Sequence, residues 1–324
     1  MRFFVLGCGS IGARHTRNLQ LLGHSDIIVY DINSALLSKF RSTHNVRSVS
    51  SIGEGTALKP DVALVCLPNH LHVSASIELA KAGIHLFIEK PLDLSLEHLP
   101  ELQALIAQHS LIDMVGCNFR FDAGMQKMHS LLQAGSTGVP LTLHANFGYY
   151  LPDWRPGTDY TLNYAAKRET GGGVMLDRIH EFDYVLWLMG EVQSVYGYAS
   201  RIGNLNIETE DNADIILKHL NGVVSTIHLD YLRREYSCSC EISCSEGILS
   251  WDFKHRTLQV YDARTKKWQD HSSDVPADTN LMYVDEIRYY LESVRKHTPT
   301  FNTVSDAAQT LQTVLKAKEA VLTR

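Results

Sequence analysis

The chain has 324 residues, of which 44% are hydrophobic and 20% charged, and its formal net charge is −6 at pH 7. This length predicts about two domains, and the composition is that of a soluble globular protein. The negative charge provides no basic field for nucleic acid or an anionic membrane, and no apolar run approaches the roughly 18 residues of a membrane span. The six cysteines do not resemble a disulfide framework. We therefore expect a cytoplasmic protein with reduced thiols and without nucleic-acid or membrane partners.

A glycine-rich turn follows the first apolar segment. Phe3–Leu6 predict a buried strand, Gly7-Cys8-Gly9-Ser10-Ile11-Gly12 follow with G-x-G-x-x-G spacing, and residues 13–22 have helical spacing. Such a turn gathers unpaired N–H groups at the positive end of a helix dipole, which favours phosphate. Gly7 allows the tight turn, Gly9 lets a pyrophosphate approach, and Gly12 lets helix and strand pack closely. The stretch predicts a dinucleotide site.

A second apolar segment, residues 27–30, ends in Asp31. This is the position, about 20 residues after the glycines, where a ribose-binding acid is expected. A carboxylate there accepts hydrogen bonds from the ribose 2′-OH and repels a 2′-phosphate, and neither residue 32 nor residue 33 is a compensating Lys or Arg. The sequence therefore predicts NAD as the cofactor, with NADP disfavoured.

Short strands and amphipathic helices alternate up to about residue 120. We expect strands at 3–6, 27–30, 62–67, 85–88 and 114–117, and helices at 13–22, 34–43, 72–82 and 95–109. Alternation of this kind predicts a parallel sheet whose ligands bind beyond the carboxyl ends of the strands. The glycine turn, Pro68-Asn69, Glu89-Lys90-Pro91 and Asn118-Phe119-Arg120 all fall at such ends. Their convergence indicates an active site.

After residue 120 the pattern changes to longer strands. We expect strands at 141–150, 192–202, 213–220, 223–232, 236–244, 248–253 and 257–261, with a hairpin at Asn221-Gly222, and helices at 174–189, 281–297 and 304–322. The fold class predicted is α/β: a Rossmann-type domain at residues 1–120, followed by an α+β domain at 121–324 with a large, mainly antiparallel open sheet.

Asp177 and His180 lie three residues apart on the expected helix 174–189. Residues at this spacing can touch, and a carboxylate can orient an imidazole and stabilise its protonated form. In the same helix Met175, Ile179, Phe182 and Leu186 form the stripe expected to face the core. A catalytic pair and a solvated helix face with an incidental ion pair remain equal alternatives.

The segment 149–167 mixes aromatic and charged residues, among them Trp154, Arg155 and Tyr164. Rings against C–H faces and donors to hydroxyls suit a polyhydroxylated ligand, and a packed loop or a subunit contact is an equal alternative. Cys238, Cys240 and Cys244 fall on one face of a strand without a fourth ligand nearby. We expect buried thiols there and no structural metal.

Together these motifs resemble the glucose–fructose oxidoreductase / inositol dehydrogenase (Gfo/Idh/MocA) family over nearly the whole chain. The similarity lies in the glycine turn, Pro68-Asn69-x-x-His72, Glu89-Lys90-Pro91, Asn118-x-Arg120-Phe121, and Gly171-Gly172-Gly173 followed by Asp177, His180 and Asp183. It implies hydride transfer between NAD(P) and a sugar-like or cyclitol substrate, and a homodimer or homotetramer formed through the C-terminal sheet. A cis peptide bond between Lys90 and Pro91 is a further expectation.

The resemblance also implies residue roles. The catalytic residues are Lys90, Asp177 and His180. The cofactor-binding residues are Gly7, Gly9, Ser10, Ile11, Gly12, Asp31, Pro68, Asn69, His72, Glu89 and Lys90. The substrate-binding residues are Arg120, Trp154, Arg155, Tyr164, Asp177 and His180. Many members place three residues between the Asp and the His, whereas this chain has two, which leaves Glu181 as an alternative to His180. An NAD(H)-binding regulator without turnover, and an imine or enone reductase, remain the competing functions.

Overall fold

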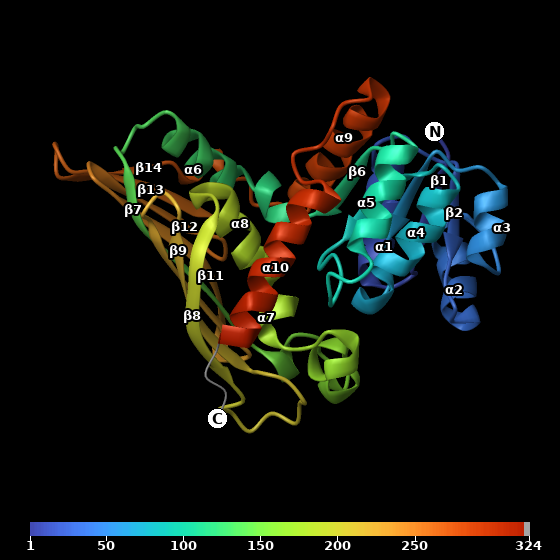
Figure 1. Cartoon of the computed structure of the whole chain (residues 1–324), viewed down its shortest axis with the longest axis horizontal. Helices are drawn as coiled ribbons and strands as arrows, with labels where there is room; N and C mark the ends of the chain where they lie inside the picture. Colours follow the sequence, from blue (N-terminus) through green and yellow to red (C-terminus); the bar gives the residue numbers. More distant parts are fainter. Residues whose placement is uncertain (321–324) are drawn as a thin grey trace. The chain divides into compact units, whose positions relative to one another are not determined.

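The computed structural model describes residues 1–320 (Figure 1). The chain divides into two compact units, which are described separately. Unit 1 comprises Met1–Asn118 and Met282–Leu311, and unit 2 comprises Phe119–Leu281 and the chain from Gln312 onwards. Among the described residues no helix has the length and apolar character needed to cross a membrane.

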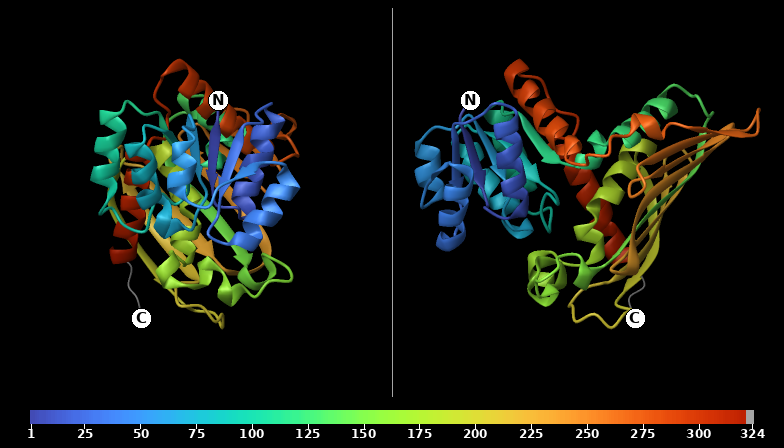
Figure 2. Two further views of the ribbon diagram at one scale, coloured as in Figure 1. Left: turned by 90° about the vertical axis from the view of Figure 1, so that its right-hand side faces the viewer. Right: turned by 180° about the vertical axis from the view of Figure 1, so that it is seen from behind.

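Unit 1 contains a six-stranded sheet in the order β3-β2-β1-β4-β5-β6, and every pair of neighbours is parallel. Helices flank the sheet on both faces (Figure 2). The strands are β1 (Phe3–Leu6), β2 (Ile27–Tyr30), β3 (Arg47–Ser48), β4 (Val62–Val65), β5 (His85–Glu89) and β6 (Asp113–Gly116). The helices are α1 (Ser10–Leu21), α2 (Ser34–His44), α3 (Ile52–Ala57), α4 (His72–Lys81), α5 (Leu99–Gln108) and α9 (Leu281–Lys296).

This strand order confirms the Rossmann-type domain. The direction of winding reverses between β1 and β4, and such a switch point is where doubly wound sheets bind nucleotides. The sequence did not predict β3 and α3, because β3 has two residues and α3 contains two glycines without an apolar stripe. The outer edge of β6 is covered by residues 300–304: Asn302 Nδ2 donates to the Val115 carbonyl at 2.7 Å, and the Val115 N–H donates to the Asn302 carbonyl at 2.9 Å.

Unit 2 contains an eight-stranded sheet in the order β14-β13-β12-β11-β7-β10-β9-β8. Only β7 and β10 pair in parallel among the strands of this sheet as the structure describes it, which confirms the mainly antiparallel prediction. The strands are β7 (Pro140–Tyr150), β8 (Val192–Ser200), β9 (Asn212–His219), β10 (Val224–Asp230), β11 (Leu232–Cys244), β12 (Gly247–Asp252), β13 (Thr257–Asp262) and β14 (Lys267–Asp270). The helices are α6 (Ala123–Gln133), α7 (Val174–Asp177), α8 (Ile179–Met189) and α10 (Val304–Ala320), the last of which begins in unit 1. The expected helix 304–322 ends outside the described residues.

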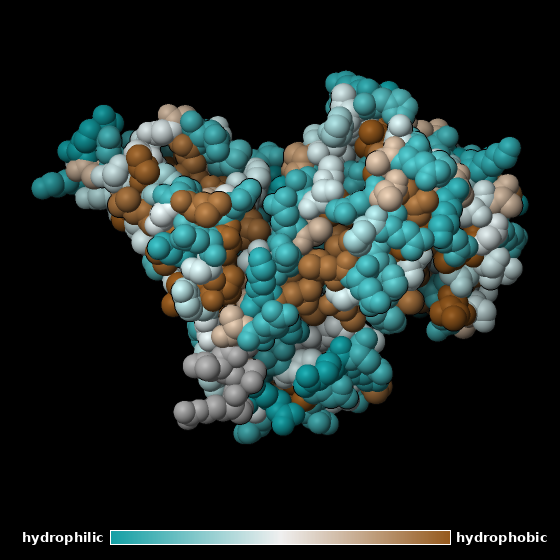
Figure 3. Space-filling model, viewed as in Figure 1, coloured by the Kyte–Doolittle hydropathy of each residue, from teal (hydrophilic) through white to brown (hydrophobic). Residues whose placement is uncertain are grey.

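The two faces of this sheet differ in character. One row in register runs Ala199, Ala213, Leu229, Phe147, Cys238, and its members are buried. α7 and α8 contact this inner face. The neighbouring row is Tyr198, Asp214, His228, Asn146, Ser239, and it lies on the opposite, outer face. No helix within residues 119–320 covers the outer face (Figures 1 and 2). Apolar residues are interspersed with hydrophilic ones over the surface of this unit (Figure 3).

The single helix expected at 174–189 is wrong in one respect. Helix α7 ends at Asp177 and α8 begins at Ile179, because Arg178 adopts φ −102° and ψ 38°, outside the helical region. The solvated face is also wrong: Glu181 and Tyr184 are fully buried, and Asp177 and His180 are 6% exposed. Because these side chains are buried, Asp177 and His180 are not an incidental ion pair on a solvated helix face.

Candidate active site

The glycine turn of unit 1 has the backbone that a dinucleotide requires. Gly7 has φ +99°, and a Cβ there would lie 2.3 Å from the Cys66 carbonyl oxygen. A Cβ on Gly12 would lie 1.9 Å from the Gly7 carbonyl oxygen, whereas a Cβ on Gly9 would meet nothing within 4 Å. Gly7 and Gly12 are therefore needed for packing, and Gly9 faces open space at the N-terminus of α1. This is where a pyrophosphate fits.

Asp31 stands next to this turn at the end of β2. Its Oδ2 accepts a hydrogen bond from the Cys8 N–H and its Oδ1 one from the Asn33 N–H, both at 2.8 Å. The carboxylate is thus fixed beside the glycine turn, at the position suited to the ribose of an NAD molecule. Ile32 is 91% exposed and supplies no positive charge.

Lys90 follows β5, and its peptide bond to Pro91 is cis, as expected. The preceding residue, Glu89, lies 2.5 Å from Nε2 of His15, a fully buried imidazole on α1. Burial alone would raise the pKa of Glu89, but the hydrogen bond and charge of His15 bring it below its usual range. The pair ties α1 to the end of β5, immediately before the expected catalytic lysine.

His72 is buried at the start of α4 and holds two backbone segments together. Its Nδ1 lies 2.8 Å from the Pro91 carbonyl oxygen and its Nε2 lies 2.8 Å from the Leu67 carbonyl oxygen. Burial lowers the pKa of this imidazole, against the effect of its two acceptors. Because both ring nitrogens contact backbone carbonyls, His72 fixes the segments that carry the Pro68-Asn69 turn and the Lys90-Pro91 bond. This arrangement favours a structural role for His72 over direct contact with the cofactor.

Asp177 in unit 2 accepts hydrogen bonds from three tyrosine hydroxyls. Tyr149 and Tyr231 donate to its Oδ2, each at 3.1 Å, and Tyr164 donates to its Oδ1. Burial, and then the charge of Asp177, raise the pKa of all three phenols well above the usual range. The phenols therefore stay protonated and act as donors that stabilise the negative charge of the carboxylate.

Aromatic side chains extend this cluster toward solvent. Trp154 is 46% exposed, and its ring centroid lies 4.4 Å from that of Tyr149 and 5.9 Å from that of Tyr236. Arg155 is exposed in the same segment, and its charge acts on the Tyr164 phenol. Residues 151–170 form short 3₁₀ turns. Three residues expected from sequence to bind substrate are therefore connected: Tyr164 donates directly to Asp177, and Trp154 reaches Asp177 through Tyr149.

His180 follows the break between α7 and α8, and its ring packs on the edge of Phe119. Arg178, at the break, donates to Glu181 Oε1 at 3.0 Å and stacks 3.4 Å from the centroid of Phe147. Glu181 also accepts a contact from the thiol of Cys238 at 3.9 Å. Glu181, the sequence alternative to His180, is thus a partner of Arg178 and fully buried, which favours His180 as the group that acts on a substrate.

Arg120 pairs with an acidic residue of the same unit. Its guanidinium forms a two-point contact with Asp183 of α8, with both N–O distances at 2.8 Å, and the side chain is buried. An arginine fork held by a carboxylate in this way fixes a helix. The geometry favours Arg120 as a support of α8 over a direct substrate ligand.

Sequence reasoning missed Tyr231 and Arg178 as members of the cluster. Tyr231 gives no signal, since an aromatic residue in a strand is ordinary. Arg178 could have been found from its i,i+3 spacing to Glu181 in an otherwise apolar helix. Cys238, Cys240 and Cys244 are buried thiols, as predicted. Residues 1–320 contain no group of three or more His, Cys, Asp or Glu side chains arranged to hold a metal.

Residues 1–117 match the model of an oxidoreductase family with an NAD-binding Rossmann fold, and residues 125–250 match the GFO/IDH/MocA C-terminal domain. Myo-inositol 2-dehydrogenase from Thermotoga maritima is 26% identical over 99% of this chain and 96% of its own length.

Two solved structures share the fold. UDP-N-acetylglucosamine 3-dehydrogenase from Acidithiobacillus ferrooxidans superposes with a TM-score of 0.83 at 22% identity, over 99% of this chain and 97% of the other. A levoglucosan dehydrogenase in complex with NADH superposes with a TM-score of 0.88 at 17% identity, over 99% and 96%. With the glycine turn and the ordered motifs in both units, these matches show that the chain belongs to the Gfo/Idh/MocA family of oxidoreductases, with an NAD-binding Rossmann domain.

Proposed function

We propose that the chain oxidises a secondary hydroxyl of a sugar, a sugar derivative or a cyclitol, or reduces the corresponding ketone. The observation that carries this proposal is the Asp177 cluster, in which a buried carboxylate, three phenols and an exposed indole lie together, three residues before His180 in the sequence. Carboxylate and phenol groups hydrogen-bond vicinal hydroxyls, and aromatic rings pack on C–H faces. Relatives named as inositol, levoglucosan and UDP-N-acetylglucosamine dehydrogenases support the same substrate class.

The proposed division of labour follows from chemistry. His180 removes the hydroxyl proton, and Asp177 orients the imidazole or binds a neighbouring hydroxyl. Lys90 is a compact cation that stabilises the developing alkoxide or, in the reverse direction, polarises the ketone. When bound at the glycine turn, NAD would supply the hydride acceptor for the redox step.

The open space at Gly9 supports cofactor binding at the glycine turn of unit 1. Gly7, Gly9, Ser10, Ile11 and Gly12 would bind the pyrophosphate and Asp31 the adenosine ribose, while Pro68, Asn69 and Lys90 would face the nicotinamide end. We assign cofactor binding to residues 1–120, and substrate binding and assembly to residues 121–324 apart from Met282–Leu311, which belong to unit 1. Asp31 favours NAD over NADP.

We also propose a cytoplasmic homodimer or homotetramer formed through the outer face of the eight-stranded sheet. Tyr196 and Ile216, paired in register on β8 and β9, are 62% and 45% exposed on this face. Apolar side chains on an open sheet face favour burial against a second copy.

A turnover screen tests the proposal. The purified chain is incubated with NAD⁺ and, separately, myo-inositol, scyllo-inositol, levoglucosan, free hexoses and UDP-N-acetylglucosamine, and NADH formation is followed by absorbance. We expect NADH and an equimolar ketone with at least one polyhydroxylated substrate, and none with the Asp177→Ala variant. Tight NAD binding without turnover of any alcohol would indicate an NAD(H)-binding regulator. Reduction of imines or enones alone would indicate an imine or enone reductase.

A further inference from the structure

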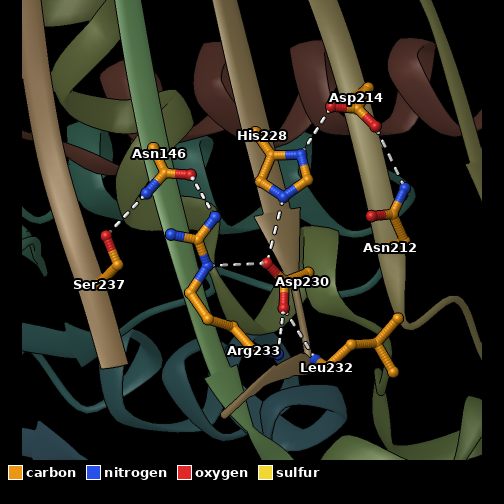
Figure 4. A network of polar contacts seen from close by, with 8 residues as sticks. All are labelled: Asn146, Asn212, Asp214, His228, Asp230, Leu232, Arg233 and Ser237. Carbon is orange, nitrogen blue, oxygen red and sulfur yellow. Dashed lines mark hydrogen bonds and ion pairs between the residues drawn. The ribbon is translucent and has the colours of Figure 1, made fainter. Parts of the chain in front are cut away.

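The outer face of the eight-stranded sheet carries a polar network that passes through Asp230, and its members come from β7, β9, β10 and β11 (Figure 4). Oδ2 of Asp230 accepts a hydrogen bond from His228 Nε2 at 3.1 Å and lies 3.5 Å from Nε of Arg233, which donates to Asn146. His228 Nδ1 contacts Asp214 at 2.6 Å on its other side. The side chain of Asp230 is 8% exposed, whereas that of Asp214 is 59% exposed. Asp230 is therefore the buried junction between the two branches of this network.

The second oxygen of Asp230 closes a turn of the backbone. Oδ1 accepts hydrogen bonds from the Leu232 N–H at 2.8 Å and from the Arg233 N–H at 2.6 Å. Between these groups lies Tyr231, the single residue between β10 and β11. The Tyr231 N–H also donates to the Asp211 carbonyl at 2.8 Å. The conformation at Tyr231 thus depends directly on the Asp230 carboxylate.

The sheet leaves room for this arrangement at Gly148 of β7. A Cβ on Gly148 would lie 2.5 Å from Asp230 Oδ2 and 2.9 Å from Arg233 Nε. The carboxylate and the guanidinium therefore occupy the volume that a side chain on β7 would otherwise fill. Such close packing distinguishes the pair from an ordinary solvated ion pair, which contributes little to order.

Neighbouring residues along an extended chain point to opposite faces of a sheet. Asp230 lies on the outer face, and Tyr231 is fully buried on the inner face, where its hydroxyl donates to Asp177 at 3.1 Å. The Tyr231 ring also packs on Tyr149, with centroids 5.3 Å apart. One peptide thus joins the outer network to the Asp177 cluster.

We propose that Asp230 is a positioning residue of the active site: by closing the turn, it holds the Tyr231 hydroxyl on Asp177. The inference rests on the proposed function in so far as Asp177 acts on the substrate. Asp230 acts through Tyr231 and has no substrate contact of its own. Removing the turn acceptor displaces the phenol and loosens Asp177.

Three variants separate this role from a general loss of structure. Asp230→Ala removes both sets of contacts, Asp230→Asn keeps an oxygen for the turn without the charge, and Asp214→Asn is the matched control on the same network. We expect Asp230→Ala to lower kcat/KM for the polyhydroxylated substrate by roughly 10–100-fold, the range for small misplacements in a site. The NAD affinity of Asp230→Ala should stay within about twofold of the wild type by the same argument. Asp230→Asn should lose less kcat/KM than Asp230→Ala, and Asp214→Asn should have the kcat/KM of the wild type.

A double-mutant cycle decides whether Asp230 acts through Tyr231. In the Tyr231→Phe background the hydroxyl is already absent, so Asp230→Ala should add little further loss of kcat/KM. Full loss in both backgrounds would overturn the proposal, because Asp230 would then act by another route.

Fluorine NMR of the full chain labelled with 3-fluorotyrosine gives a readout that needs no turnover. The Tyr231 resonance is identified by its absence from Tyr231→Phe, and it should shift in Asp230→Ala but not in Asp214→Asn. A Tyr231 resonance that does not move in Asp230→Ala contradicts the positioning role. A shifted resonance in a chain that turns over no alcohol refutes the proposed function and leaves the positioning role intact.

Discussion

At the scale of single residues, charge and space at a few positions determine what each unit can bind. Asp31 is held by two backbone N–H groups at 2.8 Å, so its carboxylate is fixed beside the glycine turn before any ligand arrives. Asp177 is likewise held by three phenols. In both units the acidic group is oriented by the protein, which lowers the cost of ordering a bound ligand.

Replacing Asp31 tests cofactor choice directly. Asp31→Ala removes the acceptor for a ribose 2′-OH and the charge that repels a 2′-phosphate. We expect weaker NAD binding, stronger NADP binding, and a preference for NAD that narrows by roughly 10-fold or more, since a hydrogen bond to a charged group contributes about 1.5–3 kcal/mol. Calorimetric titration of both cofactors measures this, with Asp26→Ala as the control. Tighter binding of NADP than of NAD by the unaltered chain contradicts the assignment.

At the scale of elements, the break between α7 and α8 and the outer network of the sheet have the largest consequences. Arg178 leaves the helical conformation, donates to Glu181 and stacks on Phe147. Helix propensity alone favours a continuous helix over residues 174–189. We attribute the break to the buried Arg178–Glu181 ion pair, which packs against Phe147 of β7. On the outer face, the pairing of His228 with Asp214 and Asp230 across β9 and β10 makes the stability of the sheet sensitive to pH.

The sign of this pH effect follows from the two pKa shifts. The hydrogen bond that His228 donates to Asp230, and then its contact with Asp214, outweigh burial and raise the pKa of His228 above 6.5. The stabilisation from His228 is therefore complete below pH 6.5 and is lost as the pH rises through the raised pKa. Burial alone would raise the pKa of Asp230. The hydrogen bonds from His228 and from the Leu232 and Arg233 backbone N–H groups outweigh burial and lower this pKa below 3.8. The contribution of Asp230 is complete above pH 3.8 and is lost as the pH falls through the lowered value.

We therefore expect the unfolding free energy lost in His228→Gln to be largest between pH 3.8 and 6.5 and to shrink above that window. Arg233 is the other charged group on Asp230. Denaturant titrations across the pH range measure the difference. His144→Gln on β7 is the control, because the partner of His144 is the neutral hydroxyl of Thr226 at 2.7 Å. A loss in His228→Gln that does not vary with pH would show that the ion pairs contribute nothing.

At the scale of the whole molecule, the uncovered outer face predicts assembly. Ile216→Asp places a charge beside Tyr196 on the exposed outer face. We expect this variant to sediment as a smaller species than the wild type in sedimentation velocity. Leu21→Asp on α1 is the matched control, since Leu21 belongs to unit 1 and is 73% exposed. Dissociation by both variants, or by neither, contradicts assembly through the outer face.

The sequence predicted those parts of the fold and site that depend on local requirements. The glycine turn, the strand that precedes it and Asp31 follow from backbone geometry within about thirty residues of chain. The partners of Asp177 could not be predicted in this way. Tyr149 and Tyr231 lie 28 and 54 residues from Asp177 and meet it only because β7 and β10 pair in parallel beneath α7. For Arg178 the i,i+3 spacing to Glu181 offered a signal, but helical spacing does not show that the pair is buried or that the helix breaks there.

The most direct test of the central claim, that this chain transfers a hydride between NAD and a polyhydroxylated substrate with Lys90 and His180 in the chemical step, is a comparison of kcat and NAD affinity across three alanine variants. With the substrate found in the screen, Lys90→Ala should lower kcat by roughly 10²–10³-fold, as the loss of one donor to a developing oxyanion does, and should leave NAD affinity nearly unchanged. His180→Ala should lower kcat and remove a pH dependence in the imidazole range, whereas Lys81→Ala, at an exposed lysine paired with Glu101, should match the wild type. Wild-type kcat in both Lys90→Ala and His180→Ala would contradict the account and move the chemistry to other residues.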